Sequence, residues 1–303
     1  MTTANDQLVK ALTTDNNFRV LAVNATGVVQ TAQQNHALHR TAAAALGRTL
    51  VASLLLANAT LKGKEGLTVR LNGQGPLGGM IVDADAAGHV KGYVQHPDVD
   101  LPQTDKQEED VATAVGTAGF LEVLKNQGGA QPYASSVPLV SGKIGDDFTY
   151  YLAKSEQIPS ALGVSVAFTT DDHVAVAGGY LIQTLPGADE TAITELEKRL
   201  QTLPSIATSL QENPDPAQLI NTIFGAEHVK ILAHLPVSFY CDCSKEKFAH
   251  SLAGIGRKDL QQLIDEDHGA EVVCNFCGQK YDFSEADLVQ ILNDQAKENE
   301  NDE

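Results

Sequence analysis

All four cysteines of this 303-residue chain lie beyond residue 240, in two close pairs. The stretch "CDC" holds Cys241 and Cys243, and "CNFC" holds Cys274 and Cys277. In a reducing compartment, clustered cysteines are typical of a metal site or a redox device rather than of structural disulfides. Soft thiolates favour Zn²⁺, and four of them complete a closed tetrahedral shell. The pattern therefore predicts a zinc site in the reduced protein, with these four cysteines as its ligands.

The segment around these cysteines, residues 237–292, is predicted to be a small zinc-binding domain. A module of about 55 residues is marginal if it depends on its apolar core alone. A structural zinc ion supplies about 10–16 kcal/mol of apparent binding free energy, which in such a module is folding free energy. Ser284, with Asp287 three residues further on, is the expected cap of the last helix. We therefore expect residues 237–292 to depend on the metal for their fold.

The spacing leaves open whether the metal is a static support or part of a switch. In extended chain the Cα atoms of Cys241 and Cys243 would be about 6.6–7 Å apart, at the upper edge of disulfide geometry. Cys274 and Cys277 could bond in the same way. Oxidation would remove the thiolates, expel the metal and withdraw its folding free energy. Because four cysteines leave no position for a reactive water, the site is not expected to be that of an enzyme.

Two other functions could use the same residues. A thiol–disulfide oxidoreductase would use Cys274 and Cys277, but its motif should open a helix within a βαβ unit. The stretch "CNFCGQKYDF" is instead typical of a tight turn followed by a strand. A zinc-ribbon adaptor for nucleic acid would need a basic surface. From Val237 onward, however, 15 acidic and 6 basic residues leave a net charge of −9.

The charge of the whole chain also argues against anionic partners. A net charge of −18 and a pI near 4.8 disfavour binding to a nucleic-acid backbone or to anionic lipid. The first residues lack the basic cluster and apolar run of a secretory signal. The most apolar run, "TLVASLLLANATL", is shorter than the roughly 20 residues that span a bilayer. We expect a cytoplasmic protein with no nucleic-acid and no membrane partner.

Residues 1–186 are predicted to form an α+β core domain. One strong helix is expected over roughly His36–Leu61, where apolar residues recur at three- and four-residue steps. A β-hairpin is expected around Asn24–Gly27, and a short helix in "DDFTYYLAKSEQ". The remaining runs are rich in strand formers and broken by glycine turns. This combination favours a domain of mixed helix and mainly antiparallel sheet.

Residues 187–236 are predicted to be a helical linker. Apolar residues recur there at helical steps: Ile193, Leu196, Leu200, Leu203, Ile206 and Leu210. The spacing fits an ordinary amphipathic helix packed on the core as well as a helix that can come loose. Residues 293–303, "NDQAKENENDE", have no apolar face and are predicted to be a disordered acidic tail.

Taken together, these stretches resemble the thirty-three-kilodalton heat-shock protein family, the redox-regulated holdase chaperones of bacteria. The cysteine pattern is similar to the zinc-binding redox centre of that family. Three further stretches match its core: "LNGQGPLGGMIVDADAAGHVKGYV", "PLVSGKIGDDFTYYLAKSEQIPSALG" and "AGGYLIQTLPG". The resemblance runs nearly end to end, and the acidic extension after Leu292 is its one departure.

The resemblance implies a function that spacing does not show. In the family, reduced cysteines hold zinc and the chaperone is inactive. Oxidation would form the disulfides Cys241–Cys243 and Cys274–Cys277 in this chain and release the zinc. The redox domain and the linker would then unfold, and the protein would dimerise. In that state it would bind unfolded proteins without ATP and prevent their aggregation under oxidative stress.

Overall fold

The computed structural model describes residues 6–105, 108–129 and 131–301, with the backbone alone at 295–301. The chain forms two compact units, one ending at Tyr240 and the other beginning at Cys241. The first unit contains both large β-sheets, and the second contains all four cysteines. The predicted α+β class is confirmed.

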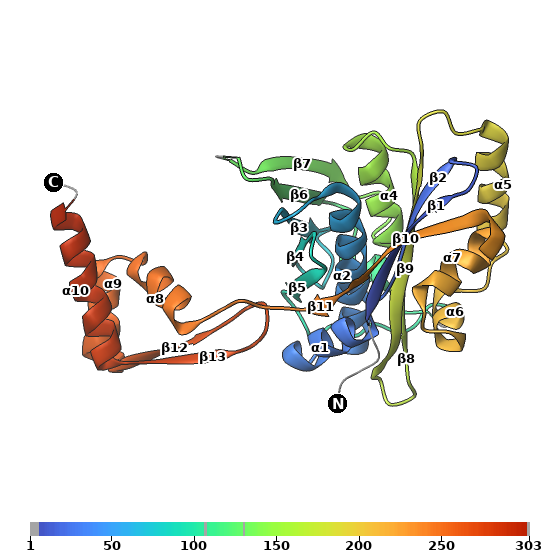
Figure 1. The fold of residues 1–303 in the computed structure, drawn as a ribbon. Helices are drawn as coiled ribbons and strands as arrows, with labels where there is room; N and C mark the ends of the chain where they lie inside the picture. The colour runs from blue at the N-terminus through green and yellow to red at the C-terminus, as the bar shows by residue number, and fades with distance from the viewer. Residues whose placement is uncertain (1–5, 106–107, 130, 302–303) are drawn as a thin grey trace. The chain divides into compact units, whose positions relative to one another are not determined.

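The elements of the first unit follow one another as mixed strands and helices (Figure 1). Its strands are β1 (Gln7–Thr13), β2 (Phe18–Asn24), β3 (Gly66–Asn72), β4 (Met80–Asp85), β5 (His89–Val94), β6 (Phe120–Asn126), β7 (Tyr133–Pro138), β8 (Ser160–Phe168), β9 (Val174–Thr184), β10 (Val229–Pro236) and β11 (Ser238–Phe239). Its helices are α1 (Thr26–His36), α2 (Arg40–Thr60), α3 (Val111–Val115), α4 (Gly145–Lys154), α5 (Glu190–Leu200), α6 (Ile206–Glu212), α7 (Pro216–Phe224) and the 3₁₀ turn η1 (Ala226–His228).

Helix α2 lies between the two sheets of the first unit (Figure 1). One sheet has the order β10-β1-β2-β9-β8, and the other has the order β11-β5-β4-β3-β6-β7. Neighbouring strands are antiparallel, except that β11 runs parallel to β5. Two basic side chains from the first sheet hydrogen-bond to the C-terminal end of α2. Lys10 donates to the carbonyl of Asn58 at 3.2 Å, and Arg19 donates to the carbonyl of Ala59 at 2.9 Å. They satisfy carbonyls that have no partner within the helix.

Helix α2 is longer than its apolar run suggested. Among the described residues it is the one helix that is long and apolar enough to cross a membrane, although the apolar run within it is shorter than a bilayer-spanning segment. Of its most apolar window, however, 89% is buried inside the protein. The apolar surface of a helix covered on all sides is accounted for by core packing. We therefore assign α2 to the core of the first unit.

The predicted hairpin around Asn24–Gly27 is wrong, because the chain enters α1 there. Asn24 accepts a hydrogen bond from the N–H of Thr26, and the Asp6 carboxylate accepts those of Gly27 and Val28. These bonds satisfy the free N–H groups at the start of a helix. The hairpin lies one strand earlier and joins β1 to β2. The helix predicted at His36–Leu61 is α2, and the short helix in "DDFTYYLAKSEQ" is α4.

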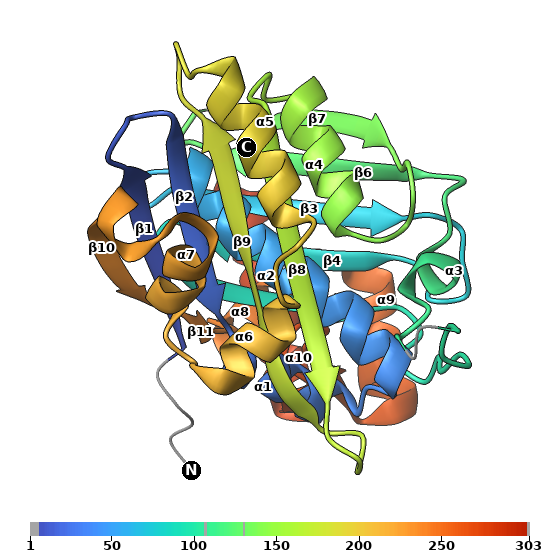
Figure 2. The ribbon, with the colours of Figure 1, turned by 90° about the vertical axis from the view of Figure 1, so that its right-hand side faces the viewer.

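Helices α5, α6 and α7 cover the outer face of the five-stranded sheet (Figure 2). They occupy most of the segment predicted as a helical linker, but its last eight residues form β10, which pairs with β1. The three helices differ in burial. Ile220 and Ile223 of α7 are fully buried, whereas α5 has no buried residue. Helix α5 is thus the most loosely held of the three.

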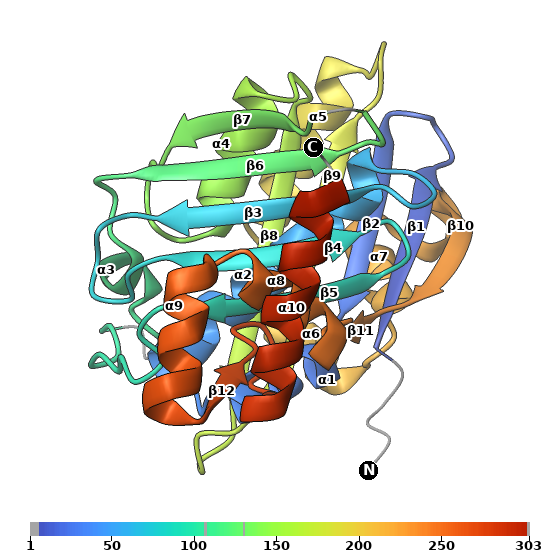
Figure 3. The ribbon, with the colours of Figure 1, turned by 90° about the vertical axis from the view of Figure 1, so that its left-hand side faces the viewer.

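The second unit is small and consists of one hairpin (Figure 1) and the helices α8, α9 and α10 (Figure 3). Its elements are α8 (Lys245–Ala253), α9 (Arg257–Gln262), the π-helical turn η2 (Leu263–Asp267), β12 (Gly269–Val273), β13 (Lys280–Ser284) and α10 (Glu285–Asn301). Among the described side chains, its apolar cluster has five buried members: Leu260, Ile264, Phe283, Leu288 and Leu292. So few buried side chains make a marginal core.

The start and the end of α10 bear on two predictions. The predicted cap is present: Ser284 N–H donates to Asp287 at 2.9 Å, and Asp287 N–H donates to Ser284 Oγ at 3.3 Å. The tail predicted as disordered, residues 293–303, is helical up to Asn301. Its Gln, Ala, Lys and Glu residues are good helix formers and continue the helix already begun. Residues 302–303 lie outside the described residues.

Candidate metal centre

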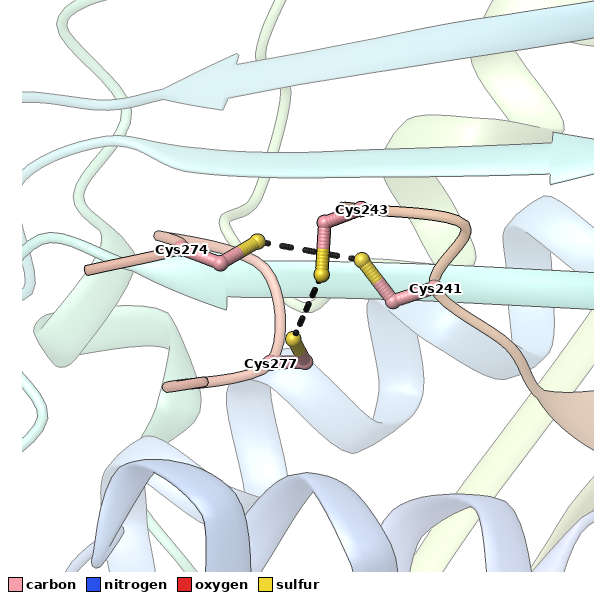
Figure 4. Close-up of side chains that lie close together, drawn as sticks. All are labelled: Cys241, Cys243, Cys274 and Cys277. Atoms are coloured by element: carbon pink, nitrogen blue, oxygen red, sulfur yellow. Dashed lines mark hydrogen bonds between the residues drawn. The ribbon is translucent and has the colours of Figure 1, made fainter. Parts of the chain in front are cut away.

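The four cysteines come from two segments that the fold of the second unit brings together (Figure 4). Cys241 and Cys243 lie in the extended segment before α8, and Cys274 and Cys277 lie in the turn between β12 and β13. The turn is tight: Gly278 N–H donates to the carbonyl of Cys274 at 2.8 Å. Gly278 has a φ of 73°, a conformation that glycine adopts at little cost. The turn thereby directs both of its cysteines toward the first pair.

The sulfur atoms lie at distances suited to a tetrahedral ion. The Sγ atoms of Cys241 and Cys274 are 3.7 Å apart, those of Cys243 and Cys277 are 3.4 Å apart, and all four lie within 4.8 Å of one another. A tetrahedral zinc ion with Zn–S bonds of about 2.3 Å would separate its sulfurs by about 3.8 Å. All four thiols are free, and Cys274 is buried. The cluster could therefore hold a metal ion, and its donor set fits zinc.

The thiols differ in how readily they ionise. Burial, together with the neighbouring thiols, raises the pKa of Cys241, and burial raises the pKa of Cys277 to about 11. Burial also opposes ionisation of Cys243, but hydrogen bonds from Tyr281 and from the other thiols outweigh it and lower its pKa. Four thiolates this close repel one another unless a cation lies among them. The cluster therefore favours binding of a cation that lets every sulfur ionise.

Tyr281 is a member of the site that the cysteine pattern does not reveal. Its phenolic oxygen lies 3.2 Å from Cys243 Sγ and 3.1 Å from the carbonyl oxygen of Cys243. The available signal in the sequence is weak: an aromatic residue in the strand after the second cysteine pair. His250 and His268, which also lie in this unit, are not among the clustered ligands.

Each predicted ligand lies in the cluster. Their service as metal ligands stays a prediction, as does the division of the chain into domains at residues 186, 236 and 292. The turn carrying Cys274 and Cys277 joins two strands of a hairpin and does not open a helix. This geometry speaks against the oxidoreductase alternative, because the low-pKa cysteine of such motifs depends on a helix N-terminus.

Comparison with known proteins identifies the family. The sequence model described as "Hsp33 protein" matches residues 6–284. The chain belongs to the Hsp33 family. It is 53% identical to the 33 kDa chaperonin of Levilactobacillus brevis, over 96% of this chain and 99% of the relative. It is 50% identical to that of Lactiplantibacillus plantarum, over 95% of this chain and 97% of the relative.

A solved Hsp33 structure has the same fold. The crystal structure of the 33 kDa chaperonin from Thermotoga maritima matches with a TM-score of 0.89 and 34% identity. The match covers 97% of this chain and all of that one. The resemblance to the thirty-three-kilodalton heat-shock proteins is therefore confirmed, and the chain is a member of a chaperone family with four clustered cysteines that could bind zinc.

Proposed function

We propose that this Hsp33 family member is an ATP-independent holdase chaperone that oxidation activates. One observation carries the proposal: four free thiols gather in one cluster, in a unit whose apolar core is very small. In the reduced protein Cys241, Cys243, Cys274 and Cys277 would hold Zn²⁺, which would supply folding free energy to residues 237–292. The chaperone is inactive in that state.

Oxidation would convert the four thiolates into the disulfides Cys241–Cys243 and Cys274–Cys277. Each disulfide releases two electrons, which reduce one molecule of hydrogen peroxide to two hydroxide ions. This pairing is taken from the family. In the structure the shortest sulfur distances run between the two segments instead, from Cys241 to Cys274 and from Cys243 to Cys277. Once the thiolates are lost, zinc leaves and the second unit loses its main stabilising element.

The apolar face under the linker helices is a candidate for client binding. Val9, Val20 and Ile182 on the outer face of the five-stranded sheet are buried beneath α5–α7. On the helix side, Ile193 and Leu196 of α5 are only partly buried. If residues 187–236 unfold as a linker, both surfaces open together. A contiguous apolar surface of this kind binds the exposed apolar segments of unfolded proteins.

The partners that we propose follow from this mechanism. They are unfolded or aggregation-prone proteins and, in the oxidised state, a second copy of the chain. We expect neither nucleic acid nor membrane to bind, because the chain carries a net charge of −18 and its most apolar helix is a core helix. The protein acts in the cytoplasm and is not an enzyme.

The test combines three measurements on one sample of full-length protein. Zinc content, free thiols and suppression of light scattering by a heat-denatured client are followed before and after treatment with peroxide at elevated temperature. We expect loss of zinc, loss of four thiols and a gain of suppression together, reversed by a dithiol reductant and zinc. Full zinc release without any change in scattering would refute the switch. Turnover in an insulin-reduction assay would favour the oxidoreductase instead.

A further inference from the structure

The hydrogen bond from Tyr281 makes the four sulfurs unequal. Cys243 lies next to the phenol of Tyr281, whose oxygen is 3.2 Å from the Cys243 sulfur. A thiolate only accepts hydrogen bonds, so with ionised sulfurs the O–H of Tyr281 is the donor.

The position of the phenol is set by its strand and by one ring contact. Tyr281 lies in β13, where it pairs with Val272 of β12. Its ring packs against Phe248 of α8, with the ring centroids 5.2 Å apart. The same hydroxyl lies 3.1 Å from the carbonyl oxygen of Cys243, which orients the cysteine backbone as well as its sulfur. A rotamer fixed in this way presents its donor at one position rather than over a range.

A hydrogen bond to a sulfur draws electron density away from it. The nucleophilicity of a thiolate falls as its basicity falls. Partners that hydrogen-bond to metal ligands also orient the ligands, and their removal typically costs about 10–100-fold in metal affinity. The Tyr281 hydroxyl at the Cys243 sulfur therefore affects both the binding of the metal and the reactivity of that sulfur.

We propose that Tyr281 positions Cys243 in the metal site and shields its sulfur from peroxide, so that Cys241 is oxidised first in its pair. The inference rests on the redox switch proposed above. In the first step the Cys241 thiolate attacks one peroxide oxygen, the O–O bond breaks and hydroxide leaves, so that Cys241 becomes a sulfenic acid. In the second step the Cys243 thiolate attacks that sulfur, the S–S bond forms and a second hydroxide leaves.

The decisive variant is Tyr281→Phe in the full-length protein, because it removes the hydroxyl and keeps the ring on Phe248. Tyr240→Phe is the matched control. Tyr240 is the neighbour of Cys241 in sequence, but its ring packs on His89 at 4.7 Å. Phe248→Leu is a second comparison, which loosens the packing of Tyr281 while the hydroxyl remains. Each protein is prepared with Zn²⁺ and, separately, with Co²⁺, whose sulfur-to-metal absorption band reports electron density on the sulfurs.

Three readouts follow: the share of early sulfenic acid trapped at Cys243 by a dimedone probe, the rate of zinc release under peroxide, and the position of the cobalt band. For Tyr281→Phe we expect a several-fold larger share at Cys243, faster zinc release and a band at longer wavelength. Zinc affinity should fall by about tenfold, at the low end of such effects. Tyr240→Phe should match the unsubstituted protein in every readout, and Phe248→Leu should leave the band where it is.

An unchanged band and an unchanged Cys243 share in Tyr281→Phe would overturn the inference. So would an equal band shift in Phe248→Leu, because the hydroxyl would then have no role beyond packing. These failures leave the proposed function intact if the unsubstituted protein still releases zinc and suppresses aggregation on oxidation. If the unsubstituted protein does neither, the switch itself is refuted.

Discussion

The two units of this protein reach a stable fold by different means. In the first, α2 is covered by two sheets, and Leu46, Leu50, Leu54 and Leu55 are fully buried along it. In the second, which has about 60 residues, the described side chains include five buried apolar residues beside the four clustered sulfurs. A core of the first kind is insensitive to redox chemistry. In the proposed function a unit of the second kind depends on four thiolates that an oxidant can remove.

The difference shows how a sensor and a stable platform can share one chain. Small domains that cannot bury enough apolar surface need a metal or a disulfide to fold. In the switch that we propose, this need makes the fold of the second unit conditional on the state of its cysteines. In that proposal the sheets of the first unit, which have a separate core, stay folded and present the face beneath α5–α7 when the second unit opens.

The largest expected effect comes from removing the metal. A strong chelator added to the reduced protein should unfold residues 241–301 and leave the core of residues 6–186 folded, because up to about 10–16 kcal/mol of binding free energy is withdrawn from the second unit. Hydrogen exchange read by mass spectrometry tests this unit by unit. Retention of protection in β12, β13 and α10 after complete zinc removal would break the comparison.

A cavity in the first core should have the next largest effect, confined to that unit. Leu54→Ala removes a fully buried side chain of α2 and should lower the free energy of unfolding by about 2–5 kcal/mol. Thermal unfolding of the first unit measures the loss. The rate of zinc release under peroxide should not change, and a large acceleration would show that the two units are not independent.

Loosening α5 should have a smaller effect, on activation rather than on global stability. Leu196 is half-buried against the five-stranded sheet, so Leu196→Ala should weaken docking of α5 by about 1 kcal/mol, part of the 1.5–3 kcal/mol that full burial is worth. We expect chaperone activity to appear at milder oxidation, measured by client light scattering. Glu197→Ala, at an exposed position of the same helix, is the control and should match the unsubstituted protein.

The smallest effect is a contrast between two carboxyl groups at helix starts, one in each unit. Burial raises the pKa of Asp6 at α1, whereas Lys245 and the Ser284 cap lower the pKa of Asp287 at α10 to about 2. A raised pKa contributes stability below the unfolded-state value near 3.9, and this is lost as pH rises through the folded value. A lowered pKa contributes stability above about 3.9 that is lost as pH falls through about 2.

NMR of both carboxyl carbons, followed from neutral pH down to the pH at which zinc release begins, measures this contrast directly. Asp6 should titrate at a higher pH than a free aspartate and Asp287 at a lower one. Lys245→Met should move the Asp287 titration upward, because Lys245 donates to Asp287 at 3.0 Å, and should leave Asp6 unchanged. Coincident titration of the two groups would contradict the contrast.

Local signals predicted elements well where the local and the tertiary preferences agree. The apolar periodicity of α2 and the Ser284–Asp287 cap are read from neighbouring residues, and both are present. The prediction failed at Asn24–Gly27, because the groups that cap α1 include Asp6, about 20 residues away. It failed again at Val229–Pro236, whose strand pairing depends on β1 at the other end of the first unit.

The sequence alone determined that four soft ligands occur in two close pairs within a segment too small for an independent core. Because ligand chemistry and chain length are properties of composition and spacing, no coordinates were needed to predict a metal-dependent module. Only the tertiary structure decided which sulfurs face each other, that Tyr281 meets Cys243, and that the last part of the linker segment joins the five-stranded sheet. Those contacts join residues far apart in the chain, so tertiary packing determines which of them meet.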